Sequence, residues 1–149
     1  MFDQTHTGGA EDHATFLATC AASPPDEIKA EAEMILPALG AVDVLQSRTG
    51  LIMQPMRDTV TGTDFHLGEV LVAEAHVRLP EHGVEGYGMV VGRDLEQAMA
   101  MALLDAARAA GTARERLTAF VRTQSEAAAQ RDDALLRRVE ATKVEMETF

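Results

Sequence analysis

The sequence predicts an α+β fold in which a four-stranded antiparallel sheet is flanked by two N-terminal helices and by C-terminal helices. Apolar residues recur at helical spacing before residue 40 and after residue 94, whereas the segment between them alternates with period two. The predicted strands follow one another with short links, which favours a meander because parallel neighbours need long crossovers. With 149 residues, 46% of them hydrophobic, the chain suits one domain over residues 1–149.

Two helices are expected before the sheet. Residues 1–10 are rich in glycine and threonine and suggest a flexible tail. A short helix is expected over residues 11–22 and a second over residues 26–39. Pro25 suits the first turn of the second helix, and Gly40 is placed to end it.

Four strands are expected in the middle of the chain. Residues 42–47 and 51–57 would pair across a turn at Arg48-Thr49-Gly50, where Gly50 would supply a positive φ angle. A third strand is expected over residues 65–79, with Gly68 as the site of a bulge. After a turn at residues 80–83, the fourth strand is expected over residues 86–91.

A long helical region is expected after the sheet. Asp94 and Gln97 have the spacing of a capping box, and Gly111 is placed to end a helix near residue 110. The centre of this helix, residues 98–104, is apolar on every side, so we expect two surfaces to cover it. A further helix is expected from residue 113, interrupted or bent near residues 130–133.

Charge and cysteine content exclude several classes of function. The formal net charge is −11, so nucleic acid and anionic membranes are poor partners. No apolar run approaches the roughly 20 residues of a membrane span. No secretory signal is evident either, and a cytoplasmic protein is expected. The single Cys20 rules out an intrachain disulfide and is expected to be a small core residue.

Histidines and acidic residues cluster in residues 65–94, but strand geometry argues against a metal site. His66 and His76 are ten residues apart in one predicted strand, about 33 Å at roughly 3.3 Å per residue. Glu74 and His76 share a face, yet two ligands rarely form a site without a third. No metal site is therefore predicted, and His66, Glu74, His76 and Arg78 are expected on the polar face of the sheet.

Glu69 departs from the alternation of this strand. It falls on the apolar face, directly after Gly68. Either a bulge at Gly68 turns Glu69 outward, or the carboxylate has a functional or interface role.

The glycines before the long helical region do not form a nucleotide motif. Gly86, Gly88 and Gly92 fall at relative positions 1, 3 and 7, whereas the dinucleotide fingerprint requires 1, 3 and 6. Arg93 and the free amides of a helix N-terminus could hold an anion, although a turn with Asp94 as N-cap explains the same residues. No nucleophile elbow or HExxH helix is present, so the sequence shows no self-sufficient active site.

Short motifs follow one another in a characteristic order from residue 49 to the C-terminus. They are Thr49-Gly50-Leu51, Thr61-Gly62-Thr63, Phe65 with Gly68-Glu69, Ala75 to Leu79, Gly86-Tyr87, Val90, Gly92-Arg93-Asp94, Ala98, Ala102-Leu103, Asp105-Ala106 and Ala141 to Glu145. Their order and spacing resemble the PhnG subunit family of the phosphonate C–P lyase system. The family usually has two aromatic residues where this chain has Met146 and Glu147.

The resemblance implies a subunit of a multi-subunit transferase that is not catalytic alone. PhnG-like proteins assemble with PhnH, PhnI and PhnJ, and PhnL is also needed for the phosphonate reaction. In that reaction a phosphonate such as methylphosphonate displaces adenine from ATP and gives ribose 1-phosphonate 5-triphosphate, with the nucleosidase chemistry attributed to PhnI. ATP is thus a substrate of the complex, and no cofactor is expected on this chain alone. Candidate partner-facing or substrate-near positions are Gly68, Glu69, Arg93, Asp94, Thr142 and Lys143.

Two other functions fit the residues. A small homodimeric binding or regulatory domain would bury the helix at residues 98–104 against its own copy. A metal-assisted hydrolase would use Glu74 and His76 with groups from another strand.

Overall fold

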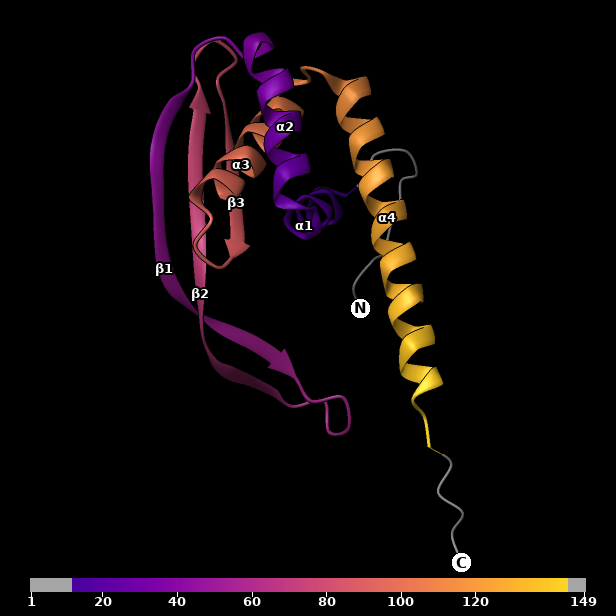
Figure 1. Cartoon of the computed structure of the whole chain (residues 1–149). Helices are drawn as coiled ribbons and strands as arrows, with labels where there is room; N and C mark the ends of the chain where they lie inside the picture. The colour runs from indigo at the N-terminus through magenta and orange to yellow at the C-terminus, as the bar shows by residue number, and fades with distance from the viewer. Residues whose placement is uncertain (1–11, 145–149) are drawn as a thin grey trace, which may run out of the picture.

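The computed structural model describes residues 12–144, which form an antiparallel sheet of order β1–β2–β3 with helices on one face (Figure 1). The predicted tail, residues 1–10, lies outside the described residues. In chain order the elements are α1 His13–Ala22, α2 Pro25–Ile35, the 3-10 helix η1 Leu36–Ala38, β1 Asp43–Arg57, β2 Asp64–Leu79, β3 Val84–Val91, α3 Leu95–Ala110 and α4 Arg114–Ala141.

The prediction of four strands is wrong, because the first two predicted strands form one continuous strand, β1. The predicted turn Arg48-Thr49-Gly50 pairs in register with residues 72–74 of β2. Gly50 is not among the glycines with a positive φ angle. Because β2 is 16 residues long, it can pair with β1 throughout, and this pairing outweighs the local turn preference. The α+β class itself is correct.

The core lies between the sheet and α3. Four residues of β2 are completely buried on this side: Ala73, Ala75, Val77 and Leu79. They are part of the apolar face that the alternation predicts. On the same side, Cys20 of α1 is also completely buried, in agreement with the prediction of a core residue.

Two glycines of β3 allow α3 to approach the sheet closely. A Cβ added to Gly86 would lie 2.2 Å from the carbonyl oxygen of Ala102, and one added to Gly88 would lie 2.2 Å from that of Ala98. Ala98, Ala102 and Ala106 recur every four residues, so one face of α3 presents small side chains to the strand. The glycines that fail as a nucleotide motif thus serve helix–strand packing.

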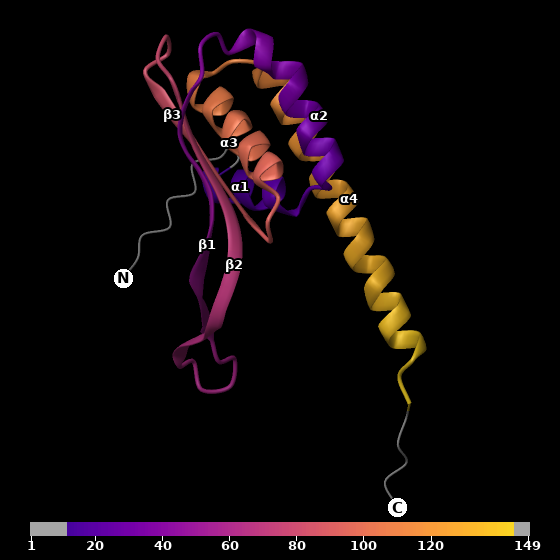
Figure 2. The ribbon, with the colours of Figure 1, turned by 60° about the vertical axis from the view of Figure 1, so that its left-hand side comes forward.

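The apolar helix α3 begins, ends and is covered by parts of the same chain. The Asp94 side chain accepts a hydrogen bond from the Gln97 backbone, and Gly111 ends the helix with φ 72°, as predicted. α2 packs on α3 away from the sheet, and α1 and α4 also contact it (Figure 2). A homodimer that buries residues 98–104 is therefore the wrong explanation for the apolar character of this helix.

Two segments extend beyond the body of the molecule in the same direction (Figures 1 and 2). One is a hairpin arm, defined here as residues 50–71. Along it β1 and β2 continue beyond residues 72–79 of β2, the part that pairs with β3. The other is the second half of α4, which runs for 28 residues without a break. The predicted interruption at residues 130–133 is wrong, because Gln, Arg and Asp each cost less than about 1 kcal/mol in a helix.

Candidate functional site

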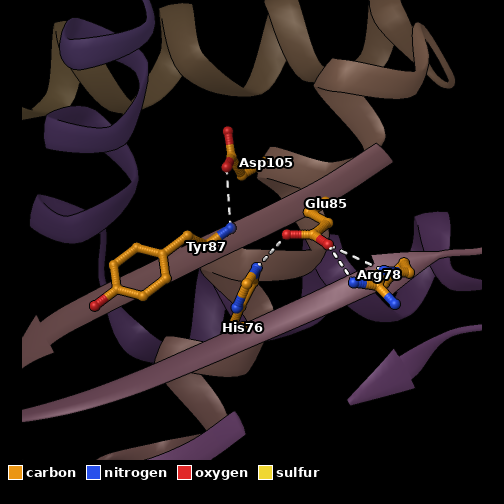
Figure 3. A network of polar contacts seen from close by, with 5 residues as sticks. All are labelled: His76, Arg78, Glu85, Tyr87 and Asp105. Atoms are coloured by element: carbon orange, nitrogen blue, oxygen red, sulfur yellow. Dashed lines mark hydrogen bonds and ion pairs between the residues drawn. The ribbon is translucent and has the colours of Figure 1, made fainter. Parts of the chain in front are cut away.

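The sheet face opposite α3 carries a network of polar side chains (Figure 3). Glu85 accepts hydrogen bonds from His76 at 2.8 Å and from Arg78 at 2.6 and 3.0 Å. These contacts, led by the one to Arg78, lower the pKa of Glu85. The ring of Tyr87 meets that of His76 edge-on, with centroids 6.2 Å apart.

Glu74 is the second acid of this face. It accepts a hydrogen bond from the Tyr87 hydroxyl at 2.6 Å and another from Arg48. Both contacts lower the pKa of Glu74. Burial, followed by the hydrogen bond to Glu74, raises the pKa of Tyr87 to about 12.

These contacts are cross-strand pairs of the kind expected for the polar face of a sheet. Glu74 and His76 each have a partner, and neither is directed at a shared open position. Within residues 12–144, no three His, Cys, Asp or Glu side chains are grouped to hold a metal ion. The hydrolase alternative gains no support from this geometry.

Asp105 joins the edge strand β3 to the helical layer. Its buried carboxylate accepts a hydrogen bond from the Tyr87 backbone N–H at 3.0 Å (Figure 3) and lies 2.6 Å from His13 Nε2. The role of this residue as an edge cap was not predicted. The available signal was an acid inside an otherwise apolar run of α3.

Each oxygen of the Asp94 carboxylate has its own hydrogen-bond partner. One carboxylate oxygen accepts from the Gln97 backbone at 2.9 Å, and the other lies 2.8 Å from Lys29 Nζ of α2. The hydrogen bond to Lys29 lowers the pKa of Asp94 and raises the pKa of Lys29. The neighbouring Arg93 is exposed. Asp94 therefore caps α3 and ties it to α2, while Arg93 remains accessible.

Gly68 and Glu69 lie in the hairpin arm. Gly68 has φ 151°, and the strand register shifts between Met53 and Pro55 of β1, opposite this point. The bulge prediction is confirmed. Glu69 pairs with Met53 and is exposed, so its carboxylate is not held in the core.

Thr142 and Lys143 follow the end of α4. The Thr142 hydroxyl donates to the Val139 carbonyl at 2.8 Å, and the Lys143 N–H donates to the Glu140 carbonyl at 3.1 Å. Both side chains are exposed. Met146 and Glu147, where the sequence departs from the family pattern, lie outside the described residues.

The six candidate positions do not form one site. They lie in β2, in the turn before α3 and after the end of α4, which are separate parts of the fold (Figure 1). No catalytic cluster is assigned among them.

Large apolar side chains are exposed on both projecting segments. On the hairpin arm they are Leu51, Met53, Met56, Val60, Phe65 and Leu67, and on α4 and just after it they are Leu135, Leu136, Val139 and Val144. Each of these side chains is at least 43% exposed. Exposed apolar groups mark surfaces for protein contacts where they form a contiguous patch.

The stripe on α4 continues a face that is buried nearer the start of the helix. Leu117 and Val121 are buried in the body, and Leu135 and Val139 fall on the same helix face at 100° per residue. All four positions recur at helical spacing in the sequence. This spacing could not show that within the described chain nothing covers the last two.

A family comparison bears on the functions left open by this geometry. Residues 11–149 match the family described as phosphonate metabolism protein PhnG. The chain belongs to the PhnG family. The predicted resemblance is thereby confirmed over nearly the whole chain, and a role in phosphonate metabolism follows. No curated protein matches the sequence.

Membership of the PhnG family assigns the chain to the phosphonate metabolism system. Among the described residues, no helix has both the length and the apolar character needed to cross a membrane.

Proposed function

We propose that this PhnG-family chain is an accessory subunit of the C–P lyase core complex. It supports the synthesis of ribose 1-methylphosphonate 5-triphosphate from ATP and methylphosphonate, with PhnI-, PhnH-, PhnJ- and PhnL-like subunits as partners. ATP is a substrate of the assembled complex rather than a ligand of this chain alone. The observation that supports the proposal best is the uncovered apolar surface on the two projecting segments.

The second half of α4 has no tertiary packing within the described chain that would stabilise it as a helix. No residue from 129 to 144 is buried. Short helices without tertiary packing are marginal in water, because most helical stability in proteins comes from an apolar face that is buried. A partner that covers Leu135 and Val139 would gain about 1.5–3 kcal/mol from each fully buried side chain.

The hairpin arm needs the same kind of support. Beyond β3 it is only two strands wide, and an isolated two-stranded hairpin is marginally stable in water. Leu51, Met53 and Leu67 are each more than half exposed there. A partner surface against the arm would cover these side chains and form a wider layer.

The charge distribution agrees with an accessory role. ATP and methylphosphonate are anions, and the net charge of −11 repels them. Of the six candidate positions, Glu69, Arg93 and Lys143 have exposed side chains suited to contact with a partner. Gly68, Asp94 and Thr142 shape the backbone beside them through the bulge, the helix cap and the end of α4.

Co-expression with the PhnI-like subunit tests the proposal. We expect the two chains to co-purify, and we expect the reconstituted complex to turn over ATP with methylphosphonate only when this chain is present. The double variant Leu135→Glu/Val139→Glu should lower capture of the partner at least about tenfold, as expected for anchor residues at an interface.

The matched control is Gln130→Glu/Ala134→Glu, which adds the same charge with the same spacing to the other side of α4. Its capture should stay within about twofold of wild type, and circular dichroism should show equal helix content for both variants. A chain that neither co-purifies with the PhnI-like subunit nor changes turnover contradicts the proposed function.

A further inference from the structure

The two edge strands of the sheet, β3 and β1, differ in whether other parts of the chain already contact their outer backbone groups. β3 is eight residues long, and its Tyr87 N–H already donates to Asp105, with α1 packed nearby. β1 is 15 residues long, and within the described residues it pairs only with β2. A strand edge left in this state presents unpaired N–H and C=O groups to another chain.

The part of β1 that is available for pairing with another strand lies between two shifts in the register with β2. The register with β2 shifts between Val44 and Gln46 and again between Met53 and Pro55, and Pro55 has no N–H to donate. Bulges and prolines protect an edge from pairing. Residues 46–53 lie between these points in regular pairing, and their length suits one typical strand.

A groove of about 420 Å³ lies next to this edge. Its walls include Lys29 and Glu33 of α2, Leu36 of η1, Ser47 of β1, and Glu96, Met99 and Leu103 of α3. α3 crosses the sheet mainly over β2 and β3, so it leaves the inner side of β1 uncovered. No residue of β1 is buried, and the inward Ser47 and Thr49 are too small to fill the space.

We propose that β1 receives a fourth strand from a partner subunit, supplied by an extended segment with apolar residues at alternate positions. Its backbone pairs with residues 46–53, and every second side chain enters the groove against Leu36, Met99 and Leu103. Main-chain hydrogen bonds provide affinity in this kind of strand addition, and alternate side-chain pockets provide specificity. This inference rests on the proposed function, because it states how one partner is held.

The charge at the groove defines the chemistry of the segment further. Glu33 and Glu96 are exposed at the groove, while Lys29 is already paired with Asp94 and Glu96. The incoming strand therefore carries a lysine or arginine next to its apolar residues. A second copy of this chain would bring a further net charge of −11 and the same two acids, so it suits the groove less well.

Hydrogen–deuterium exchange of the full chain tests the strand, first alone and then in a complex with co-expressed PhnI-, PhnH- and PhnJ-like subunits. Exchange of the amides in residues 46–53 that point away from β2 should slow at least about tenfold in the complex, because pairing with the added strand removes them from water. Ser47→Arg and Leu36→Glu each place a charged side chain in the groove and should remove that protection. Met34→Glu is the matched control, since Met34 is exposed in the groove between α2 and α4.

Each outcome decides the inference. Unchanged exchange of residues 46–53 in a complex that does form would overturn the strand and leave the subunit function intact. Protection that survives both groove variants, or that Met34→Glu also removes, overturns it as well. Protection in the chain alone, rising with concentration alongside a dimer mass in light scattering, assigns the edge to a second copy and rejects the partner strand. If no complex forms, the proposed function fails and this inference fails with it.

Discussion

Tyr87 joins two layers of the molecule through its two ends. Its hydroxyl donates to Glu74 on the outer face of the sheet, and its backbone N–H donates to Asp105 of α3. It is the single tyrosine of a chain without tryptophan, so its ionisation can be observed directly by absorbance.

We expect the native protein to show tyrosinate formation with a midpoint near pH 12, against 10.0 for an ordinary tyrosine. Because the folded state disfavours the ionised phenol, the stability contributed by Tyr87 is complete below pH 10 and is lost as the pH rises from 10 toward 12. An absorbance titration measures the midpoint, and circular dichroism confirms that the chain is folded at each pH.

Two variants separate the causes of this shift. Glu74→Gln should lower the midpoint while leaving it above 10.0, because burial is the larger cause and remains. Glu85→Gln, which changes an acid that does not touch the phenol, should leave the midpoint in place. A native midpoint of 10 would show that the hydroxyl is neither buried nor bonded to Glu74.

At the scale of elements, the contact between β3 and α3 depends on the missing side chains of two glycines. The carbonyl oxygens of Ala98 and Ala102 occupy the positions that a Cβ would need. Backbone atoms cannot turn aside as a flexible side chain can, so a larger residue must push the helix away from the sheet.

Gly86→Ala should therefore lower the free energy of unfolding by about 1–3 kcal/mol, the usual cost of overpacking a core. Gly50→Ala is the control, because Gly50 also lies in a strand, has no atom within 4 Å of an added Cβ and is not among the glycines with positive φ. It should change stability by less than about 0.5 kcal/mol in urea denaturation. Equal costs at the two positions would contradict the close approach of α3.

At the scale of the whole molecule, most of the unpaired basic side chains of the described chain lie along α4. Within residues 12–144, six exposed basic residues form no ion pair: Arg93, Arg114, Arg122, Arg131, Arg138 and Lys143. Arg93 precedes α3, and the other five are spread along the length of α4 and just after it. An anion site needs several such groups, or backbone amides, directed at one position. The proposed accessory role therefore predicts weak binding of anionic substrates by the chain alone.

The chain alone should consequently bind ATP and methylphosphonate no more tightly than about 1 mM, an affinity of about −4 kcal/mol. Isothermal titration calorimetry of the isolated chain would measure this affinity. The same titration of the complex with the PhnI-like subunit would show how much the partner increases it. Micromolar binding of ATP by the isolated chain would contradict an accessory role.

Several local features could be predicted because neighbouring residues determine them. The cap at Asp94, the end of α3 at Gly111, the bulge at Gly68 and the polar cross-strand pairs of Glu74 and His76 all follow from residue type and spacing. In each case the deciding atoms lie within one element or its direct partner strand.

The turn at Arg48-Thr49-Gly50 shows where local information was insufficient. Its residues suit a hairpin, yet β2 is long enough to pair with both predicted strands as one, and only the distant partner could decide this. The break expected at residues 130–133 failed for a similar reason, because polar residues inside a helix are tolerated when no proline or glycine is present.

The sequence by itself determined the α+β class, the helices at both ends, the apolar periodicity of α3 and α4, and membership of the PhnG family. These properties depend on residue order, which the chain carries without folding. Only the tertiary structure decided which apolar faces stay uncovered: α3 is covered by the chain's own helices, whereas β1 and the second half of α4 are not. Burial depends on what lies opposite a side chain in space, and a periodic pattern looks the same whether the opposite surface belongs to the same chain or to a partner.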